Sequence, residues 1–183
     1  MKKIVMILSA LVLGTSAMAQ DSGVSAGLEL AIPMGDFGDA FSLGYGVGVS
    51  YDREAGDQGL LGIMASFSAL SAKEDFFTKG KMIQLLCHYK YFFEDIREGA
   101  YVAPYLGWSM VGFTVDLGPL GSTDEANAGL AFGVGGGYVV NERIDIGLRY
   151  QIIRVTADGD ATASSGESSS SLSFVGLNAS YAF

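Results

Sequence analysis

Two kinds of side chain alternate along most of this chain, and this alternation limits the folds it can adopt. In residues 43–52, large apolar or aromatic side chains take every second place, with glycine, serine or aspartate between them. Successive side chains of a β-strand point to opposite faces, so a period of two indicates a strand with two unlike faces. The pattern returns in 81–91, 130–138, 144–152 and 174–183, and less richly in 24–32 and 61–69. The sequence therefore predicts an all-β fold.

An eighth run, 100–113, is harder to phase because both of its residue sets contain bulky side chains. One set holds Val102, Leu106, Trp108 and Met110, and the other holds Tyr101, Ala103, Tyr105 and Ser109. The two sets could be the opposite faces of a strand, but the sequence leaves open which of them faces outward. Pro104 cannot donate a ladder hydrogen bond, which predicts a β-bulge near the rim.

The residues that alternate with the large apolar ones form the second face of each strand, and their type distinguishes a membrane barrel from a water-soluble one. A soluble barrel needs an outer surface rich in charged and polar residues, but only 17% of this chain is charged. The second face consists mostly of glycine, alanine and serine, and the chain has 26 glycines in 183 residues. Small side chains suit the interior of a narrow barrel, and the bulky uncharged face suits contact with lipid.

The lengths of the seven predicted connections alternate along the chain. Those near 34–42, 71–80, 114–127 and 156–171 are longer than those near 53–58, 94–99 and 141–143. An antiparallel meander would therefore have one long-loop end and one short-turn end, as outer-membrane barrels of bacteria do. We predict an eight-stranded antiparallel up-and-down transmembrane β-barrel. Aromatic girdles are expected near the short-turn end (Tyr51, Tyr89, Tyr91, Tyr138, Tyr181 and Phe183) and near the long-loop end (Phe67 and Phe113).

The first nineteen residues have the layout of a cleaved export signal. Lys2 and Lys3 precede an apolar run, and Ala17-Met18-Ala19 forms an A-x-A cleavage site. We therefore divide the chain into a signal peptide, 1–19, and a barrel domain, 20–183. Cys87 is the single cysteine, so an intrachain disulfide is excluded. The net charge of −9 argues against a nucleic-acid partner, which would need a basic surface.

A small set of ionisable residues falls on the small-residue face and would lie inside the barrel. An interior charge must be paired or hydrated. Arg149 and Glu29 are expected to bridge the interior, and Lys90 and Asp145 to lie near the short-turn rim. This polar cluster of the lumen could form a gate or narrow pore, or a structural plug of salt bridges, and we favour the plug because an eight-stranded barrel is just wide enough for side chains to fill it. Its members are Glu29, His88, Lys90, Asp145 and Arg149.

The last strand and several later runs carry a family resemblance. Leu177, Tyr181 and Phe183 resemble the closing strand of bacterial outer-membrane barrels, which ends in an aromatic residue read by the barrel assembly machinery. The stretches 104–107, 133–138 and 144–150 are similar to later strands of the OmpA/OmpX-like outer-membrane β-barrel domain family. The resemblance implies an eight-stranded barrel in the outer membrane, in contact with its lipid and lipopolysaccharide. OmpA-type proteins add a peptidoglycan-binding domain, and we expect no tether of that kind after Phe183.

Together these features predict an outer-membrane protein with a structural or surface-contact role and no enzymatic activity. The alternative is a small channel for ions or apolar molecules, as OmpW-like barrels are. Lipid A deacylases are also small barrels, but their Ser-His pair faces lipid, whereas the period of two points His88 inward. We expect no cofactor and no defined metal site. The long connections are expected to contact a surface ligand, and their carboxylates to bridge lipopolysaccharide phosphates through divalent cations; these are Asp116, Asp124, Glu125, Asp158, Asp160 and Glu167.

Overall fold

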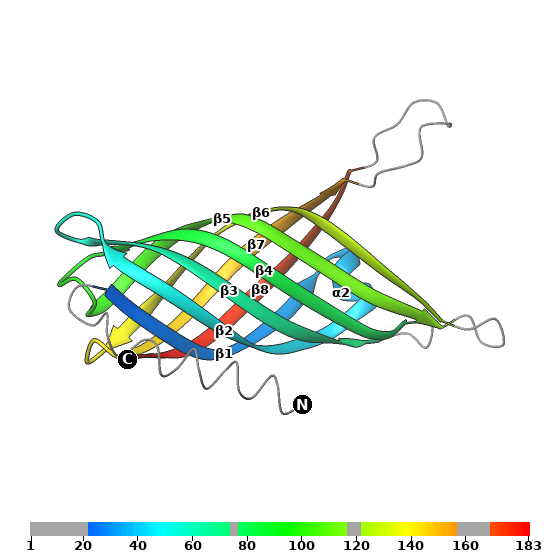
Figure 1. Cartoon of the computed structure of the whole chain (residues 1–183), viewed down its shortest axis with the longest axis horizontal. Helices are drawn as coiled ribbons and strands as arrows, with labels where there is room; N and C mark the ends of the chain where they lie inside the picture. The colour runs from blue at the N-terminus through cyan, green and yellow to red at the C-terminus, as the bar shows by residue number, and fades with distance from the viewer. Residues whose placement is uncertain (1–21, 74–76, 117–121, 157–168) are drawn as a thin grey trace.

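The computed structural model describes residues 22–73, 77–116, 122–156 and 169–183, which form a closed barrel of eight antiparallel strands (Figure 1). Each strand pairs with the next, and β8 returns to pair with β1. The predicted fold class is therefore confirmed. No helix in the described residues is long and apolar enough to cross a membrane. The strands are β1 (Ser22–Met34), β2 (Phe41–Glu54), β3 (Gly59–Ala72), β4 (Phe77–Phe92), β5 (Gly99–Asp116), β6 (Ser122–Val140), β7 (Ile144–Thr156) and β8 (Ser169–Ala182).

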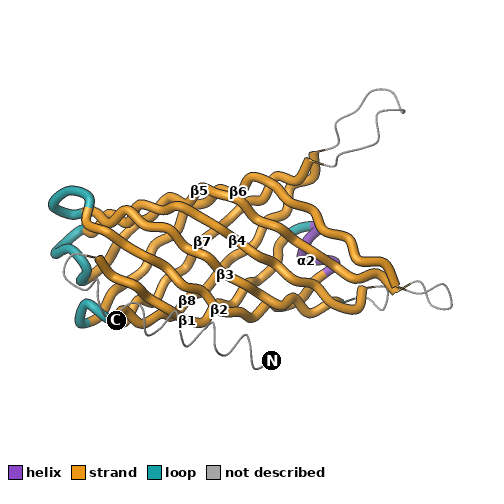
Figure 2. The backbone as a smooth tube through the Cα atoms, viewed as in Figure 1, coloured by secondary structure: helices purple, strands orange, loops and turns teal. Residues whose placement is uncertain are grey.

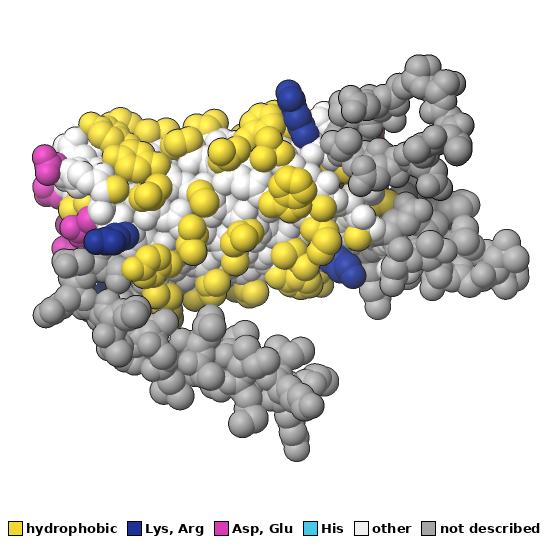
Figure 3. Space-filling model, turned by 45° about the horizontal axis from the view of Figure 1, so that its top comes forward, with side chains coloured by type: hydrophobic (Ala, Val, Ile, Leu, Met, Phe, Trp, Pro, Cys, Tyr) yellow, Lys and Arg dark blue, Asp and Glu magenta, His cyan; other side chains and the backbone are white. Residues whose placement is uncertain are grey.

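The two faces of each strand are divided as the alternation predicts. On β4, the side chain of Leu85 is 61% exposed on the outer wall, whereas Gln84 beside it is 1% exposed in the lumen. On β5, the set that contains Trp108 points outward and the set that contains Ser109 is buried, which gives the phase that the sequence leaves open. Apolar side chains cover much of the visible wall, and acidic side chains gather at the short-turn end (Figure 3).

The ends of the barrel differ, but by less than the predicted connection lengths suggest. Short turns occupy 55–58, 93–98 and 141–143 at the end where β1 begins and β8 finishes (Figure 1). At the other end the expected long connections are partly strand, since β3 runs to Ala72 and β5 to Asp116. Strand pairing continues there beyond the limits that the period-two pattern gives, for example between Asp116 and Ser122. The segments 74–76, 117–121 and 157–168, and the proposed signal 1–19, lie outside the described residues.

Pro104 does not produce the predicted bulge, so that expectation is wrong. It pairs with Val134 of β6 in an uninterrupted register. Towards β4, His88 pairs with Tyr105 and Tyr91 with Val102, which is the same register on either side of the proline. The missing N–H is therefore accommodated by a local gap in pairing and not by an extra residue.

All six aromatic residues predicted for the short-turn girdle lie on the outer wall, and Phe67 does too. Tyr51, Tyr138 and Phe183 are examples, with exposed fractions of 38%, 53% and 67%. Phe113 was assigned wrongly to the long-loop girdle, because it occupies an inward position on β5 and packs against the core.

The half of the lumen nearer the long loops is filled mainly by apolar side chains, although Ser68 and Gln151 are also completely buried there. The one-turn helix α2 (Asp36–Ala40) lies within this end of the barrel (Figure 2) and buries Phe37, whose ring meets Phe41 at 5.4 Å between centroids. Phe174, Met82 and Ile153 are each 0% exposed beneath it. We call this region the apolar layer; it comprises Ala31, Phe37, Phe41, Leu70, Met82, Val111, Ala131, Ile153, Val155 and Phe174.

Candidate functional site: a polar lumen

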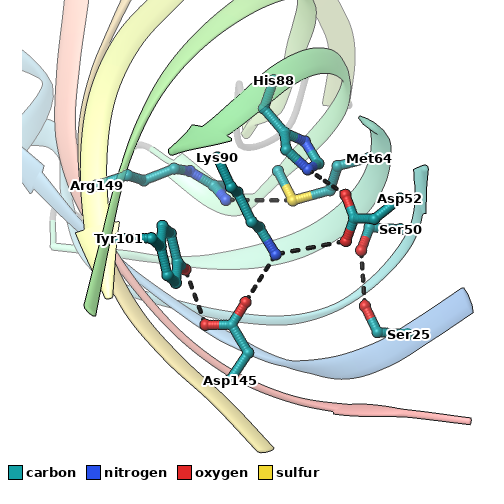
Figure 4. A network of polar contacts seen from close by, with 9 residues as sticks. All are labelled: Ser25, Ser50, Asp52, Met64, His88, Lys90, Tyr101, Asp145 and Arg149. Carbon is teal, nitrogen blue, oxygen red and sulfur yellow. Dashed lines mark hydrogen bonds and ion pairs between the residues drawn. The ribbon is translucent and has the colours of Figure 1, made fainter. Parts of the chain in front are cut away.

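A chain of charged contacts crosses the lumen near the short turns. Asp52 on β2 accepts a contact from His88 Nε2 at 2.5 Å and lies 3.4 Å from Lys90 Nζ, both on β4. Lys90 donates to Asp145 on β7 at 2.8 Å, and the other oxygen of Asp145 accepts from the Tyr101 hydroxyl at 2.8 Å. Figure 4 shows Lys90 between the two carboxylates. We call these five residues the rim network; it joins β2, β4, β5 and β7.

A second set of contacts lies deeper in the barrel. Arg149 Nη2 on β7 donates to Glu29 Oε1 on β1 at 2.6 Å and to Gln84 Oε1 on β4 at 2.8 Å. Gln84 in turn donates to Ser109 on β5 at 2.8 Å, and Arg149 Nη1 lies 3.5 Å from the sulfur of Met64 on β3. We call these five residues the central network. β3 and β7 lie four positions apart in the ring of eight strands, so the network ties opposite walls of the barrel together.

Aromatic rings complete the surroundings of both cations. Lys90 Nζ lies 5.2 Å from the centre of the Tyr101 ring. The Arg149 guanidinium lies between two rings, 5.8 Å from that of Tyr105 and 5.9 Å from that of Phe174. Contacts of this kind stabilise a cation that has left bulk water, so Arg149 is held by a carboxylate, an amide and two ring faces.

All five residues proposed for the lumen cluster lie inside the barrel, in two networks and not in one. The residues that sequence reasoning missed are Asp52, Tyr101, Tyr105 and Gln84. Asp52 could have been found, because it ends the small-residue set of the run 43–52 and therefore points inward. The aromatic and amide partners could not, because their contacts depend on which opposite strands face each other.

The interior charges are paired with one another. Lys90 lies beside both Asp52 and Asp145, Arg149 lies beside Glu29, and the ring of His88 is 4% exposed in the lumen. In the described part of the chain, no three histidine, cysteine or acidic side chains gather as a metal site would require. Breaking such a buried pair is costly even where the intact pair adds little net stability.

Glycine makes room for the rim network at one position where the effect can be tested. A β-carbon added at Gly62 on β3 would overlap Asp52 Oδ1 and His88 Nε2. We expect Gly62→Ala to separate these two side chains and lower the free energy of unfolding by about 1–3 kcal/mol, since both groups stay buried. Trp108 is the single tryptophan, so its fluorescence during urea unfolding in detergent or lipid measures the change.

Gly48→Ala is the matched control. Gly48 also points inward, from β2, but an added β-carbon there would meet Ser66 at an ordinary contact distance of 3.5 Å. We expect a much smaller loss of stability. Equal losses in the two variants would show that replacing any inward-facing glycine lowers the stability, and that the Asp52–His88 contact is not the cause.

The residues proposed as an assembly signal lie on the opposite face from the networks. Leu177, Tyr181 and Phe183 point outward, with exposed fractions of 39%, 42% and 67%. The Tyr181 and Phe183 rings meet edge to face at 5.5 Å, and the Phe183 amide donates to Val24 O on β1. The C-terminus is therefore part of the closed sheet, with its large side chains available on the lipid side.

Known structures share this architecture over almost their full length. The attachment invasion locus protein Ail of Yersinia pestis matches with a TM-score of 0.58 and 16% identity, over 91% of this chain and all of that one. The N-terminal barrel domain of Pseudomonas aeruginosa OprF matches with 0.57 and 15%, over 90% and 98%. Neisserial surface protein A matches with 0.53 and 18%, over 88% and 95%. At these identities the likeness shows the fold alone.

The sequence itself identifies the family. No curated protein sequence matches this chain significantly. The model of the outer membrane protein beta-barrel domain, however, matches residues 5–183, which is nearly the whole chain. Together with the lipid-facing wall described above, this match places the protein in the outer membrane. The chain belongs to the family of outer-membrane β-barrel domain proteins, with the small-barrel architecture of Ail, OprF and NspA.

Proposed function

We propose that this protein is a closed barrel with a structural and surface-contact role in the outer membrane, without catalysis or solute transport. The observation that carries the proposal is the filling of the lumen. The central network joins opposite walls, and above it Met82, Ile153 and Phe174 are completely buried. α2 then places Phe37 over them. Ions crossing this region would have to displace packed apolar side chains.

A surface-contact role is supported by the shape of the long-loop end and by likeness to Ail. β5 and β6 are the longest strands, with 18 and 19 residues, and their hairpin reaches this end of the barrel (Figure 1). Ail is named for attachment and invasion, and one of its structures holds the heparin analogue sucrose octasulfate. By analogy, the long-loop end of this chain is the part that would meet a surface ligand or lipopolysaccharide.

The position of His88 supports the absence of catalysis. Its Nε2 contacts Asp52, and its ring lies 5.6 Å from that of Tyr105 inside the barrel. An enzyme acting on envelope lipid would need its histidine on the lipid-facing wall. The outward-facing Leu177, Tyr181 and Phe183 are proposed to serve a different step, recognition by the barrel assembly machinery.

Conductance across a planar lipid bilayer tests the closed-lumen proposal. We expect the purified wild-type barrel to give no reproducible open steps. A variant with both Met82→Ala and Phe174→Ala removes two buried side chains of the apolar layer and should raise the conductance, which shows that inserted barrels can be detected. Reproducible steps from the wild type would overturn the proposal and support the alternative, a small channel.

A further inference from the structure

Two small cavities follow each other in the half of the lumen nearer the short turns. The outer one has a volume of about 40 Å³ and is bounded at the rim by Glu142 and Arg143, whose side chains are exposed. The inner one has a similar volume of about 40 Å³ and reaches Glu29 and Arg149. The cavities adjoin, because the same four residues line both of them: Ser25, Lys90, Asp145 and Ser180.

The inner cavity is lined by polar atoms that need a partner. Among the described residues, five side-chain atoms are buried without a hydrogen-bond partner. Ser68 Oγ and both amide atoms of Gln151 line neither cavity, whereas His88 Nδ1 and Arg149 Nε belong to side chains that line the inner one. The side chains of His88 and Arg149 are 4% and 2% exposed. A buried donor left unsatisfied costs about 1–3 kcal/mol, so an occupant that accepts a hydrogen bond is favoured at this position.

The size of the cavity selects the occupant. A buried water needs about 10–15 Å³ of cavity volume and two to four polar partners. A cavity of about 40 Å³ therefore has room for water. Waters in this cavity can accept from Arg149 Nε and pair with His88 Nδ1, which belong to the central network and to the rim network.

We propose that the short-turn half of the lumen is a dead-end water inlet, entered at the rim near Arg143 and closed at Arg149. The inlet is closed towards the long loops by Phe174. Its ring lies against the Arg149 guanidinium and is 0% exposed. Short turns of outer-membrane barrels face the periplasm, so the inlet exchanges water with that compartment. This water serves the buried polar atoms of the two networks without making the barrel a pore.

Water contacts measured by nuclear magnetic resonance test the occupant. In ¹⁵N-labelled protein in lipid nanodiscs, the Arg149 Nε–H proton should show a cross-relaxation or exchange peak with water. The side-chain amide of Gln84 is the internal control, because it is 1% exposed, donates to Ser109 and lines neither cavity. Absence of a water peak at Arg149 would overturn the proposal, as would equal peaks at both groups.

Thiol labelling tests the direction of access. In a Cys87→Ala background, a charged methanethiosulfonate reagent should modify the Ser180→Cys variant at least tenfold faster than the Ser68→Cys variant. Ser180 lines both cavities, whereas Ser68 points into the lumen on the other side of Arg149 and is 0% exposed. Equal rates would contradict a dead end. The conductance measurement is independent of both tests, so a failure of the closed-lumen function and a failure of the inlet remain distinguishable.

Discussion

Replacing Glu29 with alanine is expected to lower the free energy of unfolding by about 3–5 kcal/mol, because it leaves Arg149 as an uncompensated buried charge. The two side chains are each 3% exposed, and their contact of 2.6 Å joins β1 to β7 across the lumen. Gln84 and Met64 would remain near the guanidinium, but neither carries a negative charge. Urea unfolding of the barrel in lipid vesicles, followed by Trp108 fluorescence, measures the loss.

A double variant separates the ion pair from simple loss of volume. Removing both charges with Glu29→Ala and Arg149→Met leaves apolar side chains beside Phe174 and Tyr105, which already face this position. Since a buried pair often contributes little net stability over an apolar replacement, the double variant should be more stable than Glu29→Ala alone. If the double variant loses more stability than Glu29→Ala alone, the unpaired buried charge of Arg149 does not explain the loss in the single variant.

The faces of the strands could be predicted from the sequence because a single physical rule governs them. A period of two fixes which side chains share a face, and the apolar character of one face fixes its contact with lipid. That rule placed Leu85 outside and Gln84 inside. It also placed Arg149 and Glu29 on the same side of the sheet at similar depths, and the structure shows them in contact.

Other features depended on information that alternation does not contain. α2 is a single turn within a predicted connection, and its burial depends on the space left between the strand ends. Phe113 was misplaced because an aromatic ring fits either a girdle or a packed lumen. The contact between Lys90 and Asp145 joins strands that are not neighbours, so it depends on the diameter and register of the closed barrel. Asp52 is the one charged residue in an inward set that is otherwise glycine and serine, so its run is dominated by the small residues and the charge is easily overlooked.

An arginine placed on the outer wall is expected to lower the stability of the barrel more, the nearer it lies to the middle of the membrane. Leu85 lies midway along β4 and is 61% exposed on the wall. Leu85→Arg should cost about 2–4 kcal/mol, which is the range for arginine at the midplane of a bilayer. Folding into lipid vesicles, measured by gel mobility without heating and by urea unfolding, should show a reduced folded fraction and reduced stability.

Ile144→Arg provides the matched control at the edge of the membrane. Ile144 begins β7, is 44% exposed and follows Arg143 in the short turn, whose guanidinium already donates to the Tyr181 hydroxyl. At that level the same substitution should cost only about 0–1 kcal/mol, because the guanidinium reaches water and lipid headgroups. If the wall lies in hydrocarbon, Leu85→Arg should lose much more stability than Ile144→Arg. Equal costs would mean that Leu85 does not face acyl chains, and the assignment of the apolar wall to the membrane interior would then fail.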